Sequence, residues 1–176
     1  MSRRERGNTD RRARPALLAL AIAMSALGLA LTGATVVAPD AVDRVTGNLK
    51  VTVVGQLSDW FAPGELPTIT LGGPGDTRDL DRCSGEFTEM ISYRADGVLP
   101  LYSAHNSCGG DIILGWEIGQ QVRVGGSDVI YEVVEERHTP KSSNAASLVG
   151  MAGQFMVQTC YYGENRMRFL SLAPVT

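Results

Sequence analysis

Basic residues are scarce in this sequence beyond its first fourteen positions. Six of the sixteen lysines and arginines lie within those positions, and from Asp40 onward ten basic residues stand against seventeen acidic ones. Such an excess of carboxylates repels a phosphate backbone, and no basic stripe interleaved with aromatic side chains is present. We therefore exclude nucleic acids as partners. With 176 residues, the chain has room for one membrane segment and one globular domain.

Charged residues are absent altogether from 15 to 39. A helix over this stretch, rising about 1.5 Å per residue, would span the roughly 30 Å of hydrocarbon in a bilayer. We therefore predict a transmembrane anchor at 15–39, with the arginine-rich segment 1–14 as a cytoplasmic tail and the chain after Asp40 outside the cell membrane. A cleaved signal peptide is the alternative, because small residues at Gly33 and Ala34 suit a signal peptidase.

Cysteine is also rare, and its count is odd. The chain has three cysteines, so at least one stays unpaired within the molecule in an oxidising compartment. Cys83 and Cys108 both lie in polar, turn-rich stretches, and the sequence leaves open whether their Cα atoms come close enough for a disulfide. Cys160 ends an apolar stretch, and we expect it to be the unpaired thiol.

Sustained helical periodicity is missing after residue 40. Segment 40–67 is interpreted as a tether and lead-in, with a strand at "LKVTVV", and "LGGPGDTRD" is interpreted as a loop. The remaining chain consists of short strand-like runs separated by turn signals: "EFTEMISY", "GVLPLYSA", "QQVRV", "DVIYEVVEE", "GQFMVQTC" and "MRFLSLA". Only "SSNAASLVGMAG" has a turn or two of helical pattern. We predict an all-β fold for 68–176, a closed β-barrel of about eight strands, with a β-sandwich as the alternative.

Three side chains suited to acyl transfer stand near strand ends. Cys160 ends the run "FMVQTC", and the alternation of "MRFLSLA" groups Arg168 with Leu170, so we expect an antiparallel pairing to place Arg168 beside Cys160. His105 stands where the run "LYSA" ends, whereas His138 is interpreted as a solvated loop residue. A nearby imidazolium or guanidinium favours a thiolate, and arginine can donate hydrogen bonds to an oxyanion. Taken singly, each residue also has a purely structural explanation.

Two stretches of the chain resemble the sortases, the membrane-anchored cysteine transpeptidases of Gram-positive bacteria. They are "SAHNSCGGDIILGWEIGQQVRVGGSDVIYEVVEE" and "FMVQTCYYGENRMRFLSLAPV", which together cover roughly 101–175. In that family a strand-end histidine, a cysteine in a "TLxTC" motif and an arginine at the start of the last strand form a catalytic triad. By position these fall on His105, Cys160 and Arg168. The resemblance also implies substrate binding by three neighbouring residues: Thr159, Ala104 and Asn106.

The sequence departs from the family pattern without losing a catalytic group. Ala104 stands where glycine usually precedes the histidine, "MVQTC" replaces "TLxTC", and Gln120 replaces an aspartate. Cys83 and Cys108 are not general features of the family. These departures indicate a divergent member.

The resemblance implies a mechanism and its partners. The Cys160 thiolate would attack the carbonyl at a threonine in an LPXTG-like sorting signal, near the C-terminus of a surface protein. His105 would protonate the departing amine, and Arg168 would hold the substrate carbonyl and the oxyanion. The protein would then pass to an amine acceptor of the cell wall or pilus, a peptidoglycan precursor or a pilin lysine. We expect no cofactor and no obligatory metal.

Two other functions compete with this interpretation. The first is a membrane-tethered β-barrel that has lost activity and serves as a binding module at the cell surface. The second is a cysteine L,D-transpeptidase. Its motif packs serine, glycine and arginine around the nucleophile, an arrangement that "VQTCYYG" lacks.

Overall fold

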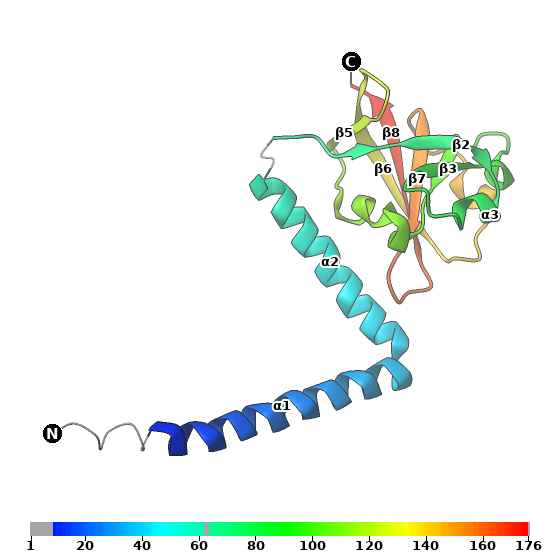
Figure 1. Ribbon diagram of the computed structural model, residues 1–176. Helices are drawn as coiled ribbons and strands as arrows, with labels where there is room; N and C mark the ends of the chain where they lie inside the picture. The colour runs from blue at the N-terminus through cyan, green and yellow to red at the C-terminus, as the bar shows by residue number, and fades with distance from the viewer. Residues whose placement is uncertain (1–8, 62–63, 176) are drawn as a thin grey trace. The chain divides into compact units, whose positions relative to one another are not determined.

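The computed structural model describes residues 9–61 and 64–175 (Figure 1). The chain divides into two compact units, Met1–Val42 and Asp43–Thr176. The first holds helix α1 (Thr9–Val37) and the first residues of helix α2 (Pro39–Phe61). Within the described residues, none of the helices combines the length and the apolar character that a membrane crossing requires. Of the predicted cytoplasmic tail, residues 1–8 lie outside the described part of the chain.

Most of α2 belongs to the second unit and packs on its barrel. Gly47 is buried against the ring of Tyr162. Lys50 pairs with Asp111, and the hydrogen bond to that carboxylate raises the pKa of the lysine. The strand predicted within 40–67 is therefore wrong, because the contacts of one helical face outweigh the β preference of its valines and threonines.

The second unit is built on one sheet of eight strands. In chain order these are β1 (Thr68–Ile69), β2 (Leu71–Gly75), β3 (Phe87–Met90), β4 (Leu101–Ser103), β5 (Gln121–Val124), β6 (Ile130–Thr139), β7 (Phe155–Cys160) and β8 (Met167–Pro174). Their order in space is β1-β5-β6-β8-β7-β4-β3-β2. The connections include helix α3 (Thr77–Leu80) and the 3₁₀ helices η1 (Ile91–Tyr93), η2 (Asn106–Cys108), η3 (Gly110–Gly115) and η4 (Ala145–Leu148).

The sheet curves back on itself because its two edge strands are almost continuous in sequence. β1 and β2 stand at opposite ends of the order, yet only Thr70 separates them. The Ile69 carbonyl accepts the N–H of Gly125 at 2.7 Å, and the Thr70 carbonyl accepts that of Phe87 at 2.9 Å. One segment thereby serves both edges, and the predicted barrel of eight strands is confirmed in a nearly closed form. The loop prediction is wrong for Leu71–Gly75, which forms β2, an edge strand that tolerates a proline.

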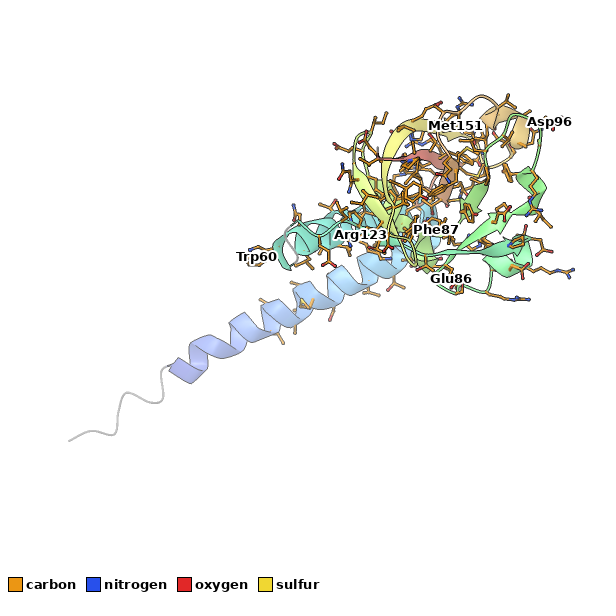
Figure 2. The ribbon with its side chains drawn as sticks, turned by 90° about the horizontal axis from the view of Figure 1, so that it is seen from above. Trp60, Glu86, Phe87, Asp96, Arg123 and Met151 are labelled. Carbon is orange, nitrogen blue, oxygen red and sulfur yellow. A yellow bond between two sulfur atoms is a disulfide. The ribbon has the colours of Figure 1, made fainter. Side chains whose placement is uncertain are left out.

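Two clusters of buried apolar side chains lie on the two faces of this sheet. The interior cluster fills the barrel and consists of Ile69, Phe87, Ala104, Ile113, Trp116, Val122, Val124, Val133, Phe155, Val157, Leu170 and Leu172. The outer cluster covers the other face and consists of Met90, Leu101, Leu148, Met151, Met156, Met167 and Phe169. Figure 2 labels one member of each cluster, Phe87 and Met151. Strand alternation explains the division, since consecutive residues of β7 fall in different clusters.

The other predicted elements appear with shifted bounds, and β6 and β8 run slightly longer than predicted. "QVRVGGSDVIYEVV" forms the antiparallel β5–β6 hairpin, and "SSNAASLVGMAG" contains η4. β7 and β8 pair in antiparallel fashion, as their short connection predicts.

Candidate active site

Cys160 is the free cysteine of the chain and ends strand β7. It is partly exposed and packs at the edge of the outer cluster, on the same face as Met156 and Gln158. The Gln158 side-chain amide donates to its Sγ at 3.8 Å. Its position at a strand end leaves the sulfur accessible beside a loop, as a nucleophile requires.

His105 follows the end of β4, the strand next to β7, by two residues. β4 runs parallel to β7 with Leu101 opposite Met156, and the Ala104 N–H donates to the Gln158 carbonyl at 3.1 Å. Ser103 pairs with Gln158, so continuing this register by two residues past the end of β4 would place His105 opposite Cys160 and on the same face. The register of β4 against β7 therefore supports the prediction that His105 and Cys160, two of the three triad residues, lie near each other.

Arg168 lies on the opposite face of the sheet from Cys160. In the β7–β8 ladder it stands opposite Thr159, while Cys160 stands opposite Met167. The Arg168 side chain is buried, with 6% of the residue exposed. The expectation that Arg168 lies beside Cys160 is therefore wrong, because a shift of one residue in register reverses the face.

The Arg168 guanidinium is held by four hydrogen bonds at the end of the barrel. Its Nε donates to Glu136 at 2.7 Å, and its two terminal nitrogens donate to the carbonyls of η3 and the residue after it: Ile113 at 2.9 Å, Leu114 at 2.7 Å and Trp116 at 2.6 Å. In this conformation the guanidinium links η3 and the residue after it to β6 and to its own strand, β8. Such a fully engaged arginine is a structural element of the barrel.

His138 belongs to a polar network that the sequence did not indicate. It lies in β6, opposite Arg168, and its Nε2 is 2.8 Å from Glu136 and 2.8 Å from the hydroxyl of Tyr161. Arg166 stacks over the Tyr161 ring at 4.1 Å. The interpretation of His138 as a loop residue is therefore wrong, because it lies within β6, whereas its expected exposure to solvent agrees with the structure.

The three residues predicted to bind substrate take part in hydrogen bonds within the protein. Thr159 is fully buried, and its hydroxyl donates to the Ala104 carbonyl at 2.8 Å. Ala104 is buried as well, so neither side chain is presented to a substrate. The Asn106 carbonyl accepts the hydroxyl of Tyr162 at 2.9 Å. The predicted substrate contacts of Thr159 and Ala104 do not agree with this burial, whereas both residues fix the register of β4 against β7.

His105 has a carboxylate partner that comes from a distant part of the chain. Its Nε2 lies 2.8 Å from Oδ1 of Asp81, the residue that caps the C-terminus of α3. The structure also joins Cys83 and Cys108 in a disulfide with Cα atoms 5.1 Å apart. No sequence motif indicates Asp81, and the two cysteines were the one signal that these segments meet.

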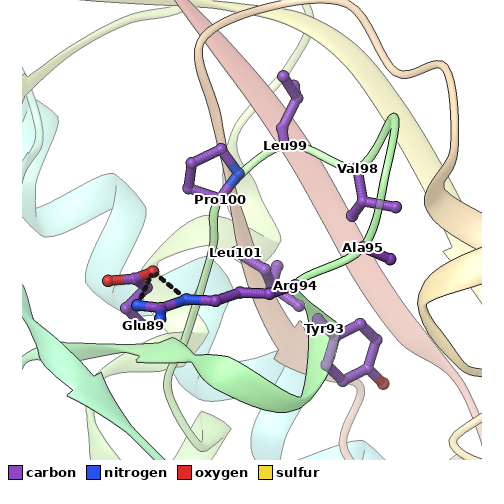
Figure 3. Close-up of a pocket in the computed structure, with 8 residues that line it drawn as sticks. All are labelled: Glu89, Tyr93, Arg94, Ala95, Val98, Leu99, Pro100 and Leu101. Carbon is purple, nitrogen blue, oxygen red and sulfur yellow. Dashed lines mark hydrogen bonds and ion pairs between the residues drawn. The ribbon is translucent and has the colours of Figure 1, made fainter.

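A cavity of about 240 Å³ lies at the connection between β3 and β4 (Figure 3). It is lined by residues of the β3–β4 connection and the ends of both strands: Glu89, Tyr93, Arg94, Ala95, Val98, Leu99, Pro100 and Leu101. Tyr93, Val98 and Leu99 pack against the outer cluster, as Cys160 does. Arg94 donates to Glu89 at 2.7 Å and 3.0 Å. The cavity therefore has apolar walls and one ion pair.

Tyr93 lines this cavity, and its pKa is influenced by the charge of Cys160. Burial raises the pKa of Tyr93, and the negative charge of a Cys160 thiolate raises it further. Its hydroxyl donates to the Ser143 carbonyl at 3.0 Å, which ties the β3–β4 connection to the segment before β7. Among the described residues, no group of three or more His, Cys, Asp or Glu side chains is placed to hold a metal ion.

Comparisons with known proteins return solved structures only. No family model matches the chain, and no curated protein matches it. Sortase D5 of Clostridium perfringens has a TM-score of 0.41 with 11% identity over 60% of this chain and 70% of that chain. Sortase C1 of Streptococcus agalactiae has a TM-score of 0.42 with 11% identity over 76% and 91%. Sortase A of Listeria monocytogenes has a TM-score of 0.40 with 13% identity over 60% and 81%. The solved structures that this chain resembles are sortases.

Proposed function

We propose that the protein is a sortase-like cysteine transpeptidase with Cys160 as nucleophile and His105 as general acid. The observation that carries this proposal is the parallel pairing of β4 with β7, whose register, continued two residues past the end of β4, would place His105 opposite Cys160. Cys160 is partly exposed and free of a disulfide, as attack on a peptide requires. The motif resemblance around both residues supports the same reaction.

The reaction proceeds in two acyl transfers. The Cys160 thiolate attacks the carbonyl carbon of a threonine in an LPXTG-like signal, the C–N bond breaks, and His105 delivers a proton to the departing amine. A thioacyl-enzyme remains. An acceptor amine then attacks the thioester carbonyl and gives up a proton to His105, which the first step left neutral. The C–S bond breaks, and the sulfur leaves as a thiolate.

In the described conformation Arg168 has a structural role in this scheme, because its guanidinium is bonded to groups at the end of the barrel. Oxyanion stabilisation by its guanidinium would require it to leave Glu136 and the three carbonyls that it now holds. Variants of Arg168 separate these two roles, because a structural arginine affects unfolding and an oxyanion donor affects turnover.

The partners of the proposed enzyme are those that the family resemblance implies, and its location is the one that the N-terminal sequence favours. The donor is the C-terminal sorting signal of a surface protein, and the acceptor is an amine of the cell wall or pilus. The charge-free stretch 15–39 behind an arginine cluster is the support for a membrane attachment that leaves the barrel outside the cell. Cysteine scanning of 38–45 with a membrane-impermeant maleimide on intact cells tests this location.

Trapping the thioacyl-enzyme tests the activity directly. The full-length protein is incubated with a library of LPXTG-like peptides without an acceptor amine, and its intact mass is recorded. The proposal expects a mass increase equal to the acyl fragment, located on Cys160 by digestion and absent from Cys160→Ala. Failure of every peptide to add mass to the wild-type protein, with Cys160 still reactive toward iodoacetamide, would contradict transpeptidation of such signals.

A second candidate is a binding module without activity, and the orientation of Arg168 favours it. A barrel whose arginine faces away from its cysteine lacks one of the three groups in the family triad. The rate of Cys160 alkylation separates the two functions, since an activated thiol reacts faster in the folded protein than in the denatured one.

A further inference from the structure

Two cross-links join the same two segments of the chain at the edge of the candidate site. Oδ1 of Asp81 lies 2.8 Å from Nε2 of His105. Two and three residues further along, Cys83 and Cys108 form a disulfide. The α3 segment and the loop after β4 are therefore connected by an ion pair and a covalent bond side by side.

Asp81 is placed by a short but well-fixed turn. α3 begins with a reciprocal capping box in which Asp76 accepts from two backbone N–H groups and Asp79 accepts the N–H of Asp76. Leu80, the last residue of α3, packs against the outer cluster together with Cys160. The Asp81 N–H donates to the Thr77 carbonyl at 2.9 Å. These contacts fix the carboxylate on the face where the thiol lies.

His105 is held from its own side by backbone contacts. Ala104, the residue before it, continues the β4–β7 pairing, and the His105 carbonyl accepts the N–H groups of Cys108 and Gly110, each at 2.9 Å. Gly110 allows no side chain, because a Cβ there would meet the Ala104 carbonyl and the Thr159 hydroxyl. The backbone at His105 is thus fixed, and Asp81 determines where its ring points.

The exposure of the pair decides what it contributes. The side chains of His105 and Asp81 are 37% and 61% exposed, and ion pairs so open to water add little to stability. Orientation is the larger effect. Because a carboxylate only accepts, the Nε2 of His105 must carry hydrogen, and Nδ1 is the ring nitrogen left to exchange a proton with a substrate.

We propose that Asp81 is a positioning residue for His105 and that the Cys83–Cys108 disulfide keeps Asp81 in place. Asp81 acts by fixing the ring orientation and the tautomer of the imidazole. The inference rests on the proposed function in one respect, that His105 is the general acid. The contact itself is independent of any activity.

Nuclear magnetic resonance of the ring nitrogens tests the contact without a substrate. The full-length protein is labelled with ¹⁵N-histidine and compared with Asp81→Ala, Asp81→Asn and the double variant Cys83→Ser/Cys108→Ser. The chain has two histidines, so His138 is the internal reference. Long-range ¹H–¹⁵N correlations of the neutral ring report which nitrogen carries the hydrogen.

The expected spectra distinguish the parts of the proposal. The wild-type protein shows His105 with hydrogen on Nε2, Asp81→Ala shows both tautomers, and Asp81→Asn keeps the wild-type pattern because its amide oxygen still accepts. The double serine variant moves toward the pattern of Asp81→Ala. Identical His105 spectra in the wild-type protein and Asp81→Ala would overturn the positioning role. A wild-type spectrum in the double serine variant would overturn the role of the disulfide.

Kinetics then connect the contact to the reaction. Asp81→Ala is expected to lower kcat about tenfold to a hundredfold, the effect of a misplaced reacting group, with KM unchanged. Asp81→Asn recovers part of kcat, and Asp128→Ala on the β5–β6 connection is the matched control. An unchanged kcat in Asp81→Ala would overturn the catalytic consequence. If the wild-type protein transfers no peptide, the proposed function fails while the histidine spectra still decide the contact.

Discussion

Arg168 stands opposite Thr159 in the β7–β8 ladder, one position from the pair formed by Cys160 and Met167. This single step of register puts the guanidinium at the end of the barrel interior and the thiol on the outer face. His105, by contrast, follows β4, whose register against β7 would place it opposite Cys160 if continued by two residues. The two strands that flank β7 therefore contribute differently to the candidate site.

Replacing Arg168 tests whether it is a structural residue. We expect Arg168→Ala to lower the free energy of unfolding by about 3–5 kcal/mol, because Glu136 and three backbone carbonyls lose their buried donor. Arg166→Ala, which removes an exposed arginine from the same strand end, should change it by less than about 0.5 kcal/mol. Urea unfolding followed by circular dichroism measures both. A stable Arg168→Ala protein without turnover would instead assign Arg168 to the oxyanion.

Counting reactive thiols tests the assignment of the three cysteines. We expect iodoacetamide to modify one thiol, Cys160, in the folded protein and three after denaturation with reduction. Denaturation without reduction should still expose one, because Cys83 and Cys108 remain joined. Three modified thiols without reductant would contradict the disulfide.

Cys160→Ala should lower peptide transfer by about 10⁶-fold, the scale of losing an acyl-transfer nucleophile.

Two glycines of α2 test how this helix packs on the barrel. A Cβ at Gly47 would overlap the ring of Tyr162, whereas a Cβ at Gly55 would meet nothing within 4 Å. We expect Gly47→Ala to destabilise the protein by about 1–3 kcal/mol through overpacking. Gly55→Ala should stabilise it by about 0.5–1 kcal/mol, since alanine loses less entropy in a helix. Chemical denaturation compares them, and equal effects would mean that α2 does not pack against Tyr162.

The sequence predicted the barrel well because local signals specify its strands. The alternation of apolar residues in "FMVQTC" and the turn residues in "VGGSDV" can be recognised without knowledge of long-range contacts. α2 was missed for the same reason, since its valines and threonines favour strands locally. Its helix is stabilised by packing against Tyr162 and Asp111, residues that lie more than sixty positions away.

The sequence could predict the candidate site only where the order of the strands alone is enough to place a residue. Alternation assigns faces within one strand, but the relation between Arg168 and Cys160 depends on how the connection from Tyr161 to Arg166 sets the register. Asp81 reaches His105 across 24 positions with no local pattern. Such contacts depend on the path of α3 over the outer face, which no local sequence period encodes.

Acid unfolding tests the carboxylate that anchors the segment before β7. Glu135 accepts the N–H of Ala152 and the Arg137 side chain, each at 2.9 Å, and these hydrogen bonds, the backbone one foremost, lower its pKa. A lowered folded pKa adds stability above the unfolded value of about 4.3, and this stability is lost as pH falls through the folded value.

Glu135→Gln should therefore show a flatter dependence of unfolding free energy on pH below about 4.5 than the wild-type protein, because its amide does not titrate. Glu132→Gln, on the same strand β6, is the matched control. Urea unfolding at a series of pH values from neutral to acidic gives the three curves. Parallel curves for the wild-type protein and Glu135→Gln would mean that the Glu135–Ala152 contact does not hold the segment before Cys160 in solution.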